Sequence, residues 1–146
     1  MADQKKNEVF TLTQQRSGQA TPRKMGDEKA ETGLLRDMKR LLELRGFVVV
    51  RVPVGAVMQR TRGGKLAFAK SPLRGFPDLM GWFRDGSGRS FVVEVKTEKG
   101  KVAPHQQEWL DSLSKLGVFC LVGRDPVDVL KRLLDAERQP IGSTSA

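Results

Sequence analysis

Apolar positions follow a helical period in three stretches of the chain. The first predicts a helix over residues 27–45 that ends at Gly46, because glycine readily adopts the conformation that closes a helix. The second predicts a helix over residues 104–116, with Pro104 in its first turn. The third begins at Asp125, a suitable N-cap, followed by Pro126. These helices leave the remaining apolar runs to be explained as strands.

Two β-branched runs predict strands on either side of the central region. Residues 47–52 are almost continuously apolar and end at Pro53, so we expect a strand covered on both faces. Residues 118–122 predict a short buried strand, parallel to its predecessor across the helix over 104–116. Between them the pattern is weaker: residues 60–65 are typical of a turn, and residues 66–69 of a short strand.

Residues 75–101 carry the most informative pattern. Two apolar runs separated by the turn Asp-Gly-Ser-Gly at 85–88 predict a β-hairpin. Side chains alternate along a strand, so Glu94 and Lys96 share one face, opposite to the apolar positions on either side of them. Asp78 precedes Glu94 by sixteen residues and lies level with it across the hairpin. Two carboxylates and an ammonium beside an apolar wall predict a divalent-metal site.

These residues resemble a known nuclease signature. Pro77-Asp78 followed by Glu94-Val95-Lys96 is similar to the PD-(D/E)XK motif. With Gly-Phe-Pro-Asp-Leu at 75–79, and then Gly100 and Gln106, the pattern resembles the VRR-NUC branch of that superfamily over residues 28–134. The order of predicted elements, αβββαβα, matches the restriction-endonuclease-like fold, a mixed α/β sheet flanked by helices. We therefore expect a nuclease domain over residues 27–137, between a flexible segment at 1–26 and a polar tail at 138–146.

The resemblance implies a metal-dependent DNA endonuclease. Mg²⁺ or Mn²⁺ would be held by two hairpin carboxylates, a backbone carbonyl and a glutamate of the first helix; these are Asp78, Glu94, Val95 and Glu31. Glu31 suits this role better than Glu28 by its spacing from the helix end. Lys96 would orient or deprotonate the attacking water, and Gln106 would position that water or a phosphate. Small members of this family are expected to form homodimers and to act on branched DNA.

The charge is unevenly distributed along the chain. The net charge is +9, and residues 36–74 hold ten Lys or Arg against two acidic residues, whereas residues 75–146 hold ten of each. A basic segment leading to paired carboxylates predicts a polyanion bound beside a chemical centre, although solubility alone is an alternative. Six cations are the candidate DNA contacts: Arg51, Arg60, Arg62, Lys65, Lys70 and Arg74. Few aromatic residues lie among them, which argues against base stacking as the main binding mode.

Composition narrows the remaining possibilities. One histidine, His105, and one cysteine, Cys120, exclude a structural zinc site and an intrachain disulfide; we expect an exposed imidazole and a buried inert thiol. The apolar runs are too short for a membrane helix and the N-terminus lacks a signal core, so a cytoplasmic protein is expected. The alternatives are a non-catalytic nucleic-acid-binding module on the same fold and a basic RNA-associated structural protein. RNA stays open as a nuclease substrate.

Overall fold

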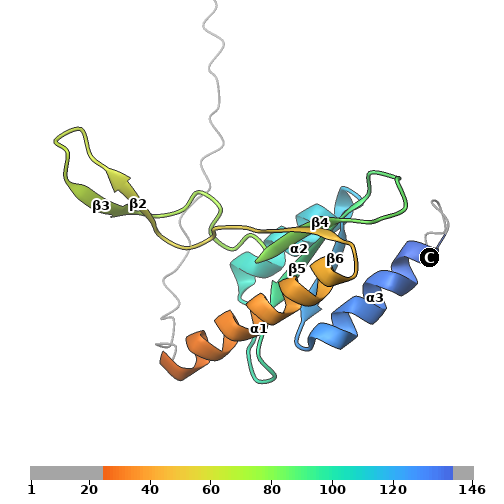
Figure 1. Ribbon diagram of the computed structural model, residues 1–146. Helices are drawn as coiled ribbons and strands as arrows, with labels where there is room; N and C mark the ends of the chain where they lie inside the picture. Colours follow the sequence, from red (N-terminus) through yellow and green to blue (C-terminus); the bar gives the residue numbers. More distant parts are fainter. Residues whose placement is uncertain (1–24, 140–146) are drawn as a thin grey trace, which may run out of the picture.

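The protein is described here by a computed structural model over residues 25–139, shown in Figure 1. The helices and strands in chain order are α1 (Met25–Leu44), β1 (Val48–Arg51), β2 (Val57–Arg60), β3 (Leu66–Ala69), β4 (Leu79–Trp82), β5 (Ser90–Val95), α2 (Pro104–Lys115), β6 (Phe119–Gly123) and α3 (Pro126–Arg138). Apart from residues 25, 26, 138 and 139, the predicted N-terminal segment and C-terminal tail lie outside the described residues.

Four strands form one mixed sheet in the order β1-β4-β5-β6. β4 pairs antiparallel with both β1 and β5, and β6 runs parallel to β5 after the crossover through α2. α1 and α3 pack side by side over one face of the sheet, and α2 lies behind it (Figure 1). Without the short β2–β3 pair, the order of elements is αβββαβα. The predicted restriction-endonuclease-like fold is confirmed.

The core lies between the sheet and the α1–α3 pair. The alternating residues Phe91, Val93 and Val95 of β5 are fully buried there, as their spacing predicts. Met38 of α1 and Leu133 of α3 reach the same core and are also fully buried. Burying such side chains contributes roughly 1.5–3 kcal/mol each, which fixes β5, and with it the polar residues at its end.

The expectation that the first strand is covered on both faces is wrong. β1 is an edge strand, and only its residue Val49 is buried, beneath α1. Val48 and Val50 point the other way and are 65% and 43% exposed. An apolar run shows that a strand can be buried on both sides, but whether a second layer covers it depends on remote elements.

The segment between β1 and β4 forms a separate hairpin. The predicted turn is present, since the Thr61 N–H donates to the Lys65 carbonyl oxygen at 2.8 Å. The predicted strand at 66–69 is also present as β3, but its partner β2 was not predicted from the sequence. The two strands pair only with each other, and Figure 1 shows them projecting from the body of the protein.

Candidate active site

Asp78 and Glu94 lie opposite each other at one end of the β4–β5 pair. Leu79 pairs with Val93 in this antiparallel register, so the next step along places Asp78 across from Glu94. Asp78 Oδ2 also accepts a hydrogen bond from the Val95 N–H at 2.8 Å, which fixes its side chain against β5. The predicted juxtaposition of the two carboxylates is present.

Lys96 is buried between carboxylates from two elements. Its N–H donates to the Gly123 carbonyl oxygen at 2.9 Å, which holds it beside the end of β6. Its Nζ lies 3.0 Å from Glu94 Oε1 and 3.8 Å from Oε1 of Glu31 on α1, and its side chain is only 1% exposed. A buried ammonium is stable only with such partners, so Glu31 joins the cluster through Lys96. Glu28, one turn earlier on α1, is exposed.

Gln106 holds Glu94 from the first turn of α2. Its Oε1 accepts the N–H of Ala103 at 2.8 Å, which leaves its Nε2 to donate to Glu94 Oε1. Both ends of the amide are therefore used, and its orientation is fixed by the start of the helix. The contact with Glu94 is a finding of the structure; the predicted role toward water or phosphate stays a prediction.

Gly75 allows α2 to come this close. Its φ is +83°, and a Cβ at this position would lie 2.6 Å from His105 Cδ2 and 2.9 Å from the His105 carbonyl oxygen. The same loop is held on α2 by Trp109, whose Nε1 donates to the Arg74 carbonyl oxygen at 3.1 Å. A side chain at position 75 would push back the turn that carries Gln106. His105 is exposed, as expected.

The two carboxyl groups are hard to ionise together. Burial, together with the nearby charge of Asp78, raises the pKa of Glu94 to about 7, and Lys96 offsets only part of this effect. Burial also raises the pKa of Asp78, although the Val95 N–H and Lys96 favour its charged form. Glu94 Oε2 is buried and has no hydrogen-bond partner among the described residues. A further positive group at this point would favour the ionised carboxylates and give Glu94 Oε2 a partner.

A hard divalent cation fits a carboxylate oxygen without a partner, and the strand register places a second carboxylate, that of Asp78, across from it. Lys96 Nζ, which also lacks a hydrogen-bond partner among the described residues, lies 3.0 Å from the other Glu94 oxygen. The described residues hold no group of three His, Cys, Asp or Glu side chains arranged for a metal ion. Glu31 lies against Lys96 instead of completing such a group. Its predicted metal contact, like that of the Val95 carbonyl, stays a prediction.

A hollow beside this cluster is bordered by Glu31, Arg51, Asp78 and Gln106. Arg51 is exposed at the end of β1, and its charge favours the ionised form of Asp78. Arg51 is therefore both exposed and close to Asp78. The other five predicted DNA contacts lie on the β2–β3 hairpin or on the segment that returns from it to β4.

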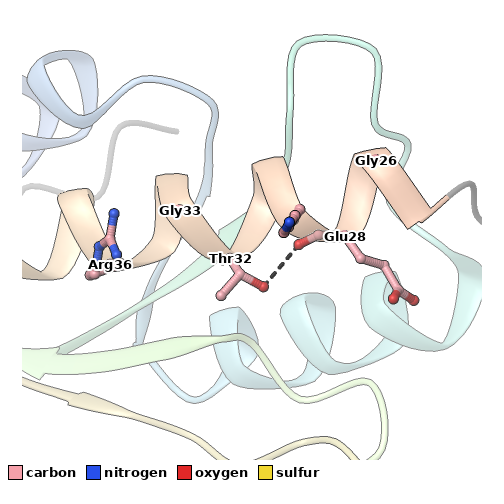
Figure 2. A pocket seen from close by; sticks show the side chains of 6 residues that line it. Gly26, Glu28, Thr32, Gly33 and Arg36 are labelled. Carbon is pink, nitrogen blue, oxygen red and sulfur yellow. Dashed lines mark hydrogen bonds between the residues drawn. The ribbon is translucent and has the colours of Figure 1, made fainter.

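A second hollow follows the exposed start of α1. Figure 2 shows its lining, with the Thr32 hydroxyl donating to the Glu28 carbonyl oxygen at 2.8 Å within the helix. Its other lining residues are Gly26, Lys29, Gly33 and Arg36. It contains one exposed carboxylate and no buried polar group, so we assign the candidate site to the hollow beside Asp78.

The sequence did not predict a role for Arg124, which holds the turn that follows Lys96. Its Nη1 donates to the carbonyl oxygens of Thr97 at 2.6 Å and Gly100 at 2.7 Å, which closes the turn that follows Lys96. Gly100 packs against the lysine stem, since a Cβ there would lie 3.4 Å from Lys96 Cδ. Nothing local in the sequence points to Arg124, because its partners are backbone atoms more than twenty residues away.

Comparison with known proteins identifies the family of the chain. The model of the VRR-NUC domain, a nuclease domain, matches residues 31–124, a span that includes Glu31, Asp78, Glu94, Lys96 and Gln106. No curated protein matches the chain. Over the part that the structure describes, no helix has the length and apolar character needed to cross a membrane. With the matched span covering more than half of the chain, the protein belongs to the VRR-NUC family.

Proposed function

We propose that this nuclease-family protein is a metal-dependent DNA endonuclease that hydrolyses phosphodiester bonds. The proposal is carried by half-buried Asp78 together with buried Glu94 and Lys96. Glu94 Oε2 lacks a hydrogen-bond partner among the described residues, and Asp78 lines a hollow that is also bordered by Arg51. In this reading the three side chains are the acidic and basic members of a PD-(D/E)XK site. The rival without catalysis, a binding module on the same fold, would have no need for a buried, unsatisfied carboxylate.

Asp78 and Glu94, with the Val95 carbonyl and Glu31, are the groups proposed to hold Mg²⁺ or Mn²⁺. When bound, such an ion supplies an activated water and relief of negative charge at the phosphate. Gln106 keeps one Glu94 oxygen fixed, which leaves Oε2 as the oxygen available to a cation. A bound cation would also offset the burial and the nearby Asp78 charge that together raise the pKa of Glu94.

Lys96 and Arg51 are proposed to act on the substrate itself. The Lys96 ammonium, held between Glu94 and Glu31, can orient the attacking water or stabilise the extra charge on the phosphorus centre. Arg51 stands at the mouth of the hollow, where its guanidinium can bind a phosphate oxygen. The cations that follow along the chain would continue this contact on neighbouring phosphates.

Replacing Asp78 with alanine tests the catalytic proposal. We expect loss of cleavage of linear and branched DNA in Mg²⁺ or Mn²⁺, with DNA affinity retained, because the cations that bind phosphate are unchanged. Asp85→Ala is the matched control, since Asp85 lies in the exposed β4–β5 turn. Calorimetric titration with Mn²⁺ separates the rival, which would bind no ion at the cluster. Cleavage by Asp78→Ala at the unaltered rate would refute the assigned role.

Selectivity for branched DNA and a homodimer form a second part of the proposal. Val48 and Trp82 face each other across β1 and β4 on the side of the sheet that is not covered there, and both are exposed, as is Val50. We propose that a second copy covers this apolar face and that the pair presents two sites to a branched substrate. Sedimentation tests the pairing: Val48→Lys should shift a dimer to monomer, and a wild-type chain that is monomeric would end this part of the proposal.

A further inference from the structure

The β2–β3 hairpin lies apart from the hydrophobic core. Its strands pair only with each other, and among the side chains that the structure describes, none of the core residues lies between Val49 and Leu79. Figure 1 shows the hairpin extending away from the sheet and helices. An isolated two-stranded hairpin is only marginally stable in water, so one that projects in this way is better suited to meeting a partner than to supporting a fold.

One face of the hairpin is apolar and exposed. The register pairs Met58 with Phe68 and Arg60 with Leu66, and alternation puts these four side chains on the same face. Met58, Leu66 and Phe68 are 49%, 62% and 77% exposed. Three large apolar side chains on one small projecting surface are unusual for a face that remains in water.

The charge around this face favours a polyanion as its occupant. The sequence from 52 to 77 contains five Lys or Arg and no Asp or Glu. All five cations, which are Arg60, Arg62, Lys65, Lys70 and Arg74, are exposed. A second copy placed against this face would bring an equally positive hairpin to it, at the cost of like-charge repulsion. A nucleic acid offers phosphates to the cations and flat apolar bases to the exposed face.

The hairpin is joined directly to the candidate active site. The segment that enters it, residues 52–56, lines a hollow together with Arg51 and Asp78. The segment that leaves it reaches Asp78 just before β4 begins. Nucleic acid bound on the hairpin would therefore continue into the site where the proposed function places the cleaved phosphate.

We infer that the apolar face of the hairpin binds unpaired bases next to the cleavage point, with Phe68 as the stacking residue. Bases inside a continuous duplex are stacked on each other and present no face to a side chain unless the duplex is opened. The face therefore selects nucleic acid with unpaired bases beside the cut, as at a fork, flap or junction. Sequence alone argued against stacking because aromatic residues are few; the exposure of Phe68 beside two other apolar side chains changes that expectation. This inference rests on the proposed function for the position of the cut.

The test measures binding without cleavage. The full chain is titrated, in chelator, against a continuous duplex, a single strand and a forked duplex with 2-aminopurine at the unpaired position next to the fork. Phe68→Ala should weaken binding to the single strand and the fork about 5-fold or more, because a base stacked on an aromatic side chain is typically worth that much. Binding to the duplex should change by less than about 2-fold, since its phosphate contacts are unaltered. Phe68→Trp keeps an aromatic ring, so it should bind the single strand and the fork as tightly as the wild type and give the same change in 2-aminopurine fluorescence.

Leu116→Ala is the matched control, because Leu116 is an equally exposed apolar residue beyond the end of α2. It should leave all three affinities unchanged. An equal loss of affinity for all three DNAs, or no loss for Phe68→Ala, would overturn the inference. So would a change from dimer to monomer in the sedimentation of Phe68→Ala, which would assign the face to a second copy. Because no cleavage is measured, a chain that cuts nothing yet shows the expected binding would refute the nuclease proposal alone.

Discussion

Replacing Glu94 with glutamine should stabilise the metal-free protein at alkaline pH. The Glu94 side chain is buried, and its pKa is about 7 in the folded chain against 4.5 for the exposed group. Between these values the folded chain keeps a proton that the unfolded chain has released, so the free energy of unfolding falls as the pH rises. Glutamine retains the shape of the protonated acid and removes this pH-dependent cost, while Lys96 keeps Glu31 as a partner.

The magnitude follows from the size of the pKa change. A rise from 4.5 to about 7 corresponds to on the order of 3 kcal/mol once the pH exceeds 7, because one pKa unit is worth about 1.4 kcal/mol. For a chain of this length, that difference is a rise of roughly 10 °C in Tm. Near pH 4 the acid is protonated in both states, so the two proteins should melt at similar temperatures.

The assay is thermal unfolding followed by circular dichroism, in chelator, from pH 4 to pH 9. Glu98→Gln is the control, since Glu98 is exposed just beyond Lys96 and should show no such trend. Adding Mn²⁺ should raise the Tm of the wild type and leave that of Glu94→Gln unchanged, because a ligand stabilises only the folded state that binds it. A variant that melts at or below the wild type at pH 8 in chelator would show that ionised Glu94 is not a cost to the fold.

Two further substitutions probe the supports of the site. Gly75→Ala should reduce the free energy of unfolding by about 2 kcal/mol or more and should also lower the cleavage rate, because it combines a positive φ with a collision against His105. Chemical denaturation and activity assays measure the two effects. Gly86→Ala is the control, since Gly86 has a similar φ but open space around it. Arg124→Gln should loosen the turn after Lys96 and lower kcat while substrate affinity changes little, whereas Arg132→Gln, on the exposed face of α3, should leave both unchanged. If a variant and its control change stability and activity to the same extent, Gly75 or Arg124 does not support the site as proposed.

Local patterns were sufficient to predict the central hairpin and the positions of Asp78, Glu94 and Lys96 on it. The alternation of β5 fixed which residues face the core, and the turn at 85–88 set the register that brings Asp78 level with Glu94. Asp125 caps α3 by accepting the Asp128 N–H at 2.8 Å, as its position before a proline indicates. These features depend on neighbours within one strand, one turn or one helix end, so they can be read from the order of residues.

Only the tertiary structure decided how remote segments complete the site. Whether β1 is covered, whether Glu31 meets Lys96, and which group Gln106 holds all depend on how helices pack on the sheet. The supports given by Gly75 and Arg124 are likewise contacts with distant backbone atoms. A sequence records which side chains could make such contacts, whereas the packing of the whole chain selects one arrangement among them, because each contact depends on the positions of all the others.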